Sequence, residues 1–119
     1  MADGDSTYVT ERRSKPRSLV SVPMSMYDQG HRLLLRARTV DLSASGAMVH
    51  GAGPIRIGQT VSVEVLRGNA RNPLRLQAEV VRIATPTEHR RRHGVAVRFL
   101  DVGTLDETIL EGIIAAAKR

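Results

Sequence analysis

The sequence predicts an all-β fold, a small antiparallel barrel or sandwich of about six strands, with an α-helix at the C-terminus. Two observations support this prediction. Apolar and polar residues alternate with a period of two in a series of short segments, which turn residues separate from one another. Near the C-terminus, the spacing of the apolar residues becomes helical instead. At 119 residues, the chain is long enough for one domain with a single modest core.

The predicted strands follow one another at short intervals. The first contains Pro23, which has no N–H to donate, so this strand lies at a sheet edge or pairs on only one side there. The second covers residues 33–40, and the stretch 41–46 separates it from a short third strand at 47–50. The alternating apolar residues of the first strand and of the last three are Val20, Val22, Met24 and Met26; Val61, Val63 and Val65; Leu74, Leu76, Ala78 and Val80; and Val95, Val97 and Phe99.

The C-terminal segment is predicted to be a helix that docks on the strands. Thr104 and Glu107 are three residues apart, the spacing of a capping box at a helix start. Lys118 and Arg119 fall in the last turn, where the helix dipole favours cations. The apolar residues at helical spacing, which would face the strands, are Leu105, Ile109, Leu110, Ile113 and Ile114.

The chain is strongly basic, and its cations are almost all arginine. It has 18 Lys and Arg against 12 Asp and Glu, a formal charge of +6, and its only lysines are Lys15 and Lys118. Guanidinium groups recognise phosphates and purine edges with a planar fork, which ammonium groups lack. This composition therefore suggests a phosphate-bearing or acidic partner. A surface that only keeps the protein soluble explains the composition equally well.

Several classes of protein are excluded or disfavoured. The chain has no cysteine, so it has no disulfides, cysteine-bound zinc or thiol nucleophile. His89 and His93 flank three arginines, which would repel a metal ion, and no catalytic motif is present, so we expect neither a metal, a cofactor nor an enzyme. No apolar run approaches the roughly 20 residues of a membrane helix, and no signal peptide is evident, which predicts a cytoplasmic protein without a membrane anchor.

A basic β-barrel that binds nucleic acid is the second hypothesis for the function. Barrels that bind single strands stack successive bases on aromatic side chains. The aromatic residues here are Tyr8, Tyr27 and Phe99, and Phe99 shares the alternation of the core valines. A nucleic acid would therefore be held by salt-sensitive charge alone, which disfavours this hypothesis.

Two short motifs could instead form one anion site. Arg13 and Arg17 form an Arg-x-x-x-Arg pattern, and Pro16 between them keeps this segment out of a regular helix. Asp41-Leu-Ser43-Ala-Ser-Gly46 combines a carboxylate, a hydroxyl and a glycine that permits close approach. A carboxylate can accept from the N1–H and the exocyclic amine of guanine. Considered alone, the first motif also fits solvated arginines and the second an ordinary turn.

In this order, the two motifs resemble those of the PilZ domain family. The segment GVAVRF and the terminal helix also look like that family, so the resemblance covers roughly residues 11–117. The resemblance implies a six-stranded antiparallel β-barrel with a C-terminal helix that binds the bacterial second messenger cyclic di-GMP. It implies that Arg13 and Arg17 hold phosphates and guanine edges. It also implies that Asp41, Ser43 and Gly46 hold a guanine.

The resemblance divides the chain into a flexible lead at 1–11 and a PilZ domain at 12–118, made of an arginine arm (12–18), a barrel (19–100) and a helix (104–118). In such domains an arginine at the position of Arg12 tends to accompany an intercalated pair of ligands. We expect the ligand to order the arm, which is too polar to bury itself, and thereby to create a surface for an unidentified effector protein.

Arg82 is a further candidate ligand residue. It continues the alternation of Leu74 to Val80 and would therefore face the barrel interior, where an arginine needs a partner or a position at the rim. A stacked purine, Glu79 or Asp101 could be that partner.

Overall fold

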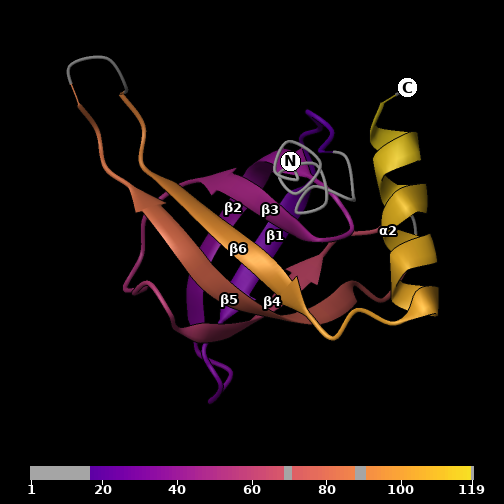
Figure 1. Ribbon diagram of the computed structural model, residues 1–119, viewed down its shortest axis with the longest axis horizontal. Coiled ribbons are helices and arrows are strands. Elements are labelled where there is room, and N and C mark those ends of the chain that lie inside the picture. Colours follow the sequence, from indigo (N-terminus) through magenta and orange to yellow (C-terminus); the bar gives the residue numbers. More distant parts are fainter. Residues whose placement is uncertain (1–16, 69–70, 88–90, 119) are drawn as a thin grey trace, which may run out of the picture.

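The computed structural model describes residues 17–68, 71–87 and 91–118. The flexible lead expected at 1–11, and the site residues Arg12 and Arg13, lie outside the described residues. This part of the chain forms six strands and one helix, which are labelled in Figure 1. They are β1 (Pro23–Tyr27), β2 (Leu33–Leu42), β3 (Gly46–His50), β4 (Thr60–Val65), β5 (Leu74–Ala84), β6 (Gly94–Leu100) and α2 (Thr104–Ala117).

The strands form one closed antiparallel barrel in the order β1-β2-β3-β6-β5-β4. The predicted six-stranded barrel with a C-terminal helix is thus confirmed. Because the barrel is closed, β1 is not an edge strand. Pro23 pairs with Arg38 of β2, and on the side of β4 its carbonyl accepts a hydrogen bond from the Leu66 N–H at 3.1 Å, so the missing proline N–H costs one bond on that side.

The alternating apolar residues predicted for the strands fill the barrel. Val61, Val63 and Val65 of β4 have no exposed surface, and Phe99 of β6 is also buried. Thr39 of β2 is also buried, and its hydroxyl accepts a hydrogen bond from the Val22 N–H at 2.9 Å and donates one to the Val20 carbonyl. These two bonds satisfy the backbone N–H of Val22 and the backbone carbonyl of Val20, which precede β1 and its ladder of strand hydrogen bonds.

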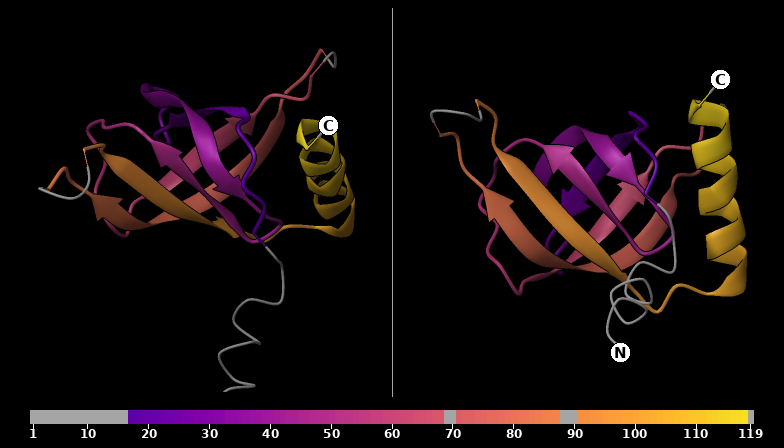
Figure 2. Two further views of the ribbon diagram at one scale, coloured as in Figure 1. Left: turned by 90° about the horizontal axis from the view of Figure 1, so that it is seen from above. Right: turned by 45° about the horizontal axis from the view of Figure 1, so that its top comes forward.

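Helix α2 packs at one end of the barrel, beside the start of β5 and after the end of β6 (Figure 2). Leu110 and Ile114 are buried, whereas Leu105 is 72% exposed, so its predicted place on the packed face is wrong. The predicted capping box is also wrong. The N-cap residue is Gly103, so Thr104 already lies inside the first turn and its hydroxyl cannot cap the helix. Lys118 is the C-cap residue.

Of the three register shifts in the described strands, one between β1 and β2, one in β2 against β3 and one in β5, the last two decide which side chains face outward near the middle of the barrel. In β2, Thr39 pairs with Val49 and Asp41 with Met48, which leaves Val40 as the extra residue. In β5, Val80 pairs with Val97 and Arg82 with Ala96, which leaves Val81 as the extra residue. The inward positions consequently step by three, from 39 to 42 and from 80 to 83.

The bulge in β5 contradicts the expected inward orientation of Arg82. With Val81 inserted, Arg82 lies opposite the outward-facing Ala96, and it is exposed on the outer face of the barrel. It therefore needs no partner inside the core.

In the part of the chain that the structure describes, no helix combines the length and the apolar character that crossing a membrane requires.

Candidate functional site: a groove across four strands

A groove of about 560 Å³ crosses the outer face of four neighbouring strands, β2, β3, β6 and β5. The two bulges supply its sides, because they turn Asp41 of β2 and Arg82 of β5 outward. Met48 of β3 and Ala96 of β6 lie between them. The volume is within the range of roughly 300–1,000 Å³ that is common for small-molecule pockets.

Arg17 and Asp41, one residue from each sequence motif, meet at the groove. Arg17 Nη1 lies 3.8 Å from Asp41 Oδ2, and the two side chains are 56% and 14% exposed. The position of Arg17 follows from its neighbour, because Ser18 and Leu42 exchange two backbone hydrogen bonds, at 3.0 and 2.9 Å. Because the pair is long and Arg17 is about half exposed, Arg17 can exchange this partner at small cost, whereas the largely buried Asp41 needs another donor in its place.

Ser43 shapes the turn at the end of the groove. Its side chain is buried, and its Oγ accepts hydrogen bonds from the backbone N–H groups of Ser45 and Gly46 at 3.1 and 3.3 Å. The Ser43 N–H donates to the Gly46 carbonyl at 2.9 Å, which closes the same turn. Much of the hydrogen-bonding capacity of Ser43 is therefore used within the protein.

Gly46 is required by the close approach of β6. A Cβ atom at this position would lie 2.3 Å from the Val97 carbonyl oxygen, a distance that real Cβ atoms do not show. The predicted close approach at this glycine is therefore present, but it is an approach of backbone to backbone. Gly46 holds β3 against β6 at the groove, where it pairs with Arg98.

The three arginines of the described groove differ in their partners. Arg17 faces Asp41, and Arg98 forms an ion pair with Glu79 of the neighbouring strand. Arg82 has neither a hydrogen bond nor an ion pair to the described residues. Glu79, considered above as a partner for Arg82, is thus engaged by another arginine. Arg82 brings the one uncompensated positive charge among the described groove residues.

Arg98 was not predicted as a site residue. The inward alternation of Val95, Val97 and Phe99 places it on the outer face, but its position beside Gly46 depends on the pairing of β3 with β6. The sequence prediction missed four apolar residues of the groove for a related reason; they are Met48, Ala96, Val40 and Val81. Nothing in the local sequence shows that two bulges bring these apolar residues to one groove.

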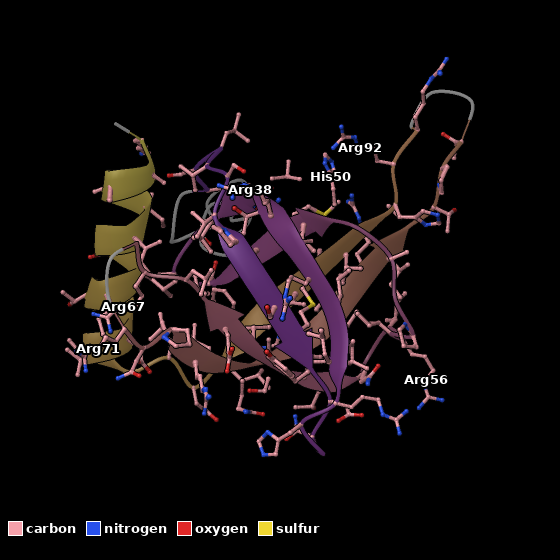
Figure 3. All side chains as sticks on the ribbon, turned by 180° about the vertical axis from the view of Figure 1, so that it is seen from behind. Arg38, His50, Arg56, Arg67, Arg71 and Arg92 are labelled. Atoms are coloured by element: carbon pink, nitrogen blue, oxygen red, sulfur yellow. The ribbon has the colours of Figure 1, made fainter. Side chains whose placement is uncertain are left out.

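The described residues give no sign of a metal centre or of a surface for stacking a nucleic acid. No group of three or more His, Asp or Glu among them could hold a metal ion. Phe99 is buried, and the hydroxyl of Tyr27 donates to Glu64 outside the groove. Figure 3 shows Arg67 and Arg71 beside α2 and Arg56 on the opposite side of the barrel, so these arginines do not form one continuous track.

Comparisons with known proteins agree on one family and fold. The family model of the PilZ domain matches residues 11–116. The PilZ domain of YcgR from Escherichia coli, solved with cyclic di-GMP, is 22% identical, with 91% of this chain and 92% of that chain covered and a TM-score of 0.68. The Bacillus subtilis inhibitor of motility MotI/DgrA is 15% identical, with 90% and 51% covered and a TM-score of 0.69.

MrkH of K. pneumonia, solved in complex with cyclic di-GMP, is 12% identical, with 87% of this chain and 51% of that chain covered and a TM-score of 0.62. At these identities the solved structures show the shared fold. The present chain spans about half the length of MotI/DgrA and MrkH. A comparison with curated protein sequences finds no match.

Proposed function

The chain belongs to the PilZ domain family, and from this premise we propose that it is a receptor that binds cyclic di-GMP in the groove across β2, β3, β6 and β5. The observation that carries the proposal is the meeting of Arg17 and Asp41, from two motifs that are 24 residues apart in the chain, at the side of one groove. PilZ domains are receptors rather than enzymes, and the proposal includes no catalytic step.

The chemistry of the groove suits the parts of this ligand. A guanidinium can bind a phosphate with two hydrogen bonds, or the O6 and N7 atoms of guanine. Arg82 is available for either contact without breaking an existing ion pair, and Arg17 has only its weak pair with Asp41 to lose. Once released, Asp41 can accept from the N1–H and exocyclic amine of a guanine.

Ser43 and Gly46 support this site in two ways under the proposal. They hold the turn and the β3–β6 contact that position Asp41, and the O–H of Ser43, whose two lone pairs already accept from the turn, can be redirected to donate to the guanine. Arg13 completes the first motif as a ligand of phosphate or of a guanine edge. Arg12 adds a cation that would offset the charge of a second, intercalated ligand.

The proposed signal is the ordering of the arm over the bound ligand. The change is expected in the arm, residues 12–18. Ser18 joins this arm to the barrel, because its backbone is bonded to Leu42. Arginines of the arm that reach the ligand would then form, together with it, a surface for an effector protein.

Titration calorimetry with cyclic di-GMP tests the proposal directly. We expect binding of cyclic di-GMP with preference over cyclic di-AMP and GMP, because Asp41 can accept two hydrogen bonds from a guanine edge. Equal affinity for the adenine and guanine dinucleotides would contradict it. Tighter binding of random single-stranded oligonucleotides would instead support the second hypothesis, a nucleic-acid-binding barrel.

A further inference from the structure

The groove has an apolar floor, although the barrel face around it is polar. One row of paired residues crosses the four strands in the order Asp41, Met48, Ala96 and Arg82. With strands about 4.8 Å apart, this row spans about 14 Å between the backbones of β2 and β5. It thus has a carboxylate at one end, a guanidinium at the other, and two apolar side chains between them.

These apolar side chains are not part of the barrel core. Met48 and Ala96 are half-buried on the outer face, and neither they nor the bulge residues Val40 and Val81 pack in the core cluster. All four line the groove. The neighbouring row of outward-facing residues is polar. In it, Arg98 of β6 pairs with Gly46 of β3 on one side and with Glu79 of β5 on the other. A local apolar surface framed by charged residues indicates a contact with something other than water.

The conformation of Met48 depends on a glycine in the neighbouring strand. A Cβ atom on Gly94 would lie 2.4 Å from Met48 Cε, which means that the Met48 side chain runs along the sheet and over Gly94. Any larger residue at 94 would force the end of this side chain upward, into the groove. The missing side chain of Gly94 therefore allows Met48 to lie flat.

We propose that Met48, lying flat over Gly94, and Ala96 form a stacking floor for one base of the ligand, so that the groove selects for a planar base and not only for phosphate. The inference rests on the proposed binding of cyclic di-GMP. A base on this floor presents its edge to Asp41 and its face to the sulfur and methyl groups of Met48, which suit aromatic surfaces. Asp41 selects the edge of the base, and the floor selects its planar shape.

A double-mutant cycle tests whether Gly94 acts through Met48. Calorimetry would compare Met48→Ala, Gly94→Ala and the double variant with the unaltered protein. We expect Met48→Ala to weaken cyclic di-GMP binding about five- to tenfold, because part of the apolar contact area is lost. Gly94→Ala should weaken it by a similar factor, yet have no further effect when Met48 is already alanine. Additive effects of the two changes would overturn the coupling between Gly94 and Met48.

A second ligand distinguishes contacts to the face of the base from contacts to its edge. Cyclic di-IMP, whose hypoxanthine lacks the exocyclic amine, should lose affinity by the same factor as cyclic di-GMP in the Met48→Ala variant. Asp41→Ala should reduce binding of the guanine ligand more than that of the hypoxanthine ligand. A Met48→Ala effect confined to the guanine ligand would overturn the inference, since Met48 would then act on the edge.

Two further variants control for folding and for nonspecific effects. Met48→Gln keeps the length of the side chain and meets no clash, so it tests the floor even if Gly94→Ala fails to fold, and it should also weaken binding several-fold. Leu33→Ala, an exposed apolar residue outside the groove, should leave the affinity unchanged. If the unaltered protein binds and the Met48 variants bind equally well, the floor is refuted and the receptor function stands. If the unaltered protein does not bind, the receptor function itself fails and the floor fails with it.

Discussion

Replacing Gly46 by alanine should destabilise the barrel, although the substitution adds only one methyl group. The new Cβ would lie 2.3 Å from the Val97 carbonyl oxygen, whereas ordinary contact begins at 3.4 Å, so β3 and β6 must separate by about 1 Å. Overpacking of this kind costs about 1–3 kcal/mol, and a weakened hydrogen bond of the ladder adds about 1 kcal/mol. We therefore expect a loss of about 2–4 kcal/mol from a total stability that is typically only 5–15 kcal/mol.

Thermal unfolding followed by circular dichroism measures this loss, which should lower the melting temperature by on the order of 10 °C. Gly112→Ala is the matched control. Gly112 lies on the exposed face of α2 with no atom within 4 Å of its added Cβ, so the same substitution should stabilise the protein by about 0.5–1 kcal/mol. A Gly46→Ala variant that melts like the unaltered protein but no longer binds cyclic di-GMP would refute the reasoning. It would show that this glycine makes room for the ligand rather than for β6.

Three further predictions concern the ligand. Asp41→Ala should remove the preference for cyclic di-GMP over cyclic di-AMP, a loss of about 1–3 kcal/mol in discrimination by calorimetry, and an unchanged preference would exclude the proposed guanine contact. Arg12→Leu should shift the calorimetric stoichiometry from two ligands per chain toward one without altering the melting temperature; one ligand on the unaltered protein would contradict the intercalated pair. On ligand binding, amide hydrogen exchange should slow in residues 12–18 and 41–47, and least at Ser18 and Leu42, whose amides are hydrogen-bonded to each other's carbonyls. Equal protection of 12–18 with and without ligand would exclude ordering of the arm.

The strands could be predicted because one physical pattern determines them. A half-buried antiparallel strand alternates apolar and polar residues, and the valines of β4 show this alternation without interruption. The same rule fails at Arg82, because one inserted residue, Val81, reverses the direction of every side chain that follows it. The capping box at Thr104 failed for another reason. Its spacing was correct, but the chain enters the helix one residue earlier, at Gly103.

The site could be predicted only where its residues share a local motif. Asp41, Ser43 and Gly46 lie within one stretch of six residues, at the end of β2 and in the turn to β3, so their spacing in the sequence already indicates that they act together. Arg98 and Met48 reach the same groove through the pairing of β3 with β6, which joins residues about 50 positions apart in the chain. Such long-range pairing depends on the closure of the whole barrel and leaves no signal in the local sequence.

The charge balance of the groove indicates why it should favour cyclic di-GMP over a long polyanion. Among the described groove residues, Arg17 and Arg98 each face a carboxylate, and Arg82 alone is uncompensated. A phosphate polymer would gain one ion pair at Arg82, but any further contact with the described groove arginines would first separate one of them from its acidic partner. A guanine dinucleotide compensates for that separation, because its base edge occupies Asp41 when its phosphate draws Arg17 away. Binding is then an exchange of partners in which both charges remain satisfied, and this exchange requires a ligand that carries a guanine edge and a phosphate together. Selectivity in this groove should therefore depend less on its net positive charge than on the acidic residues placed among its arginines.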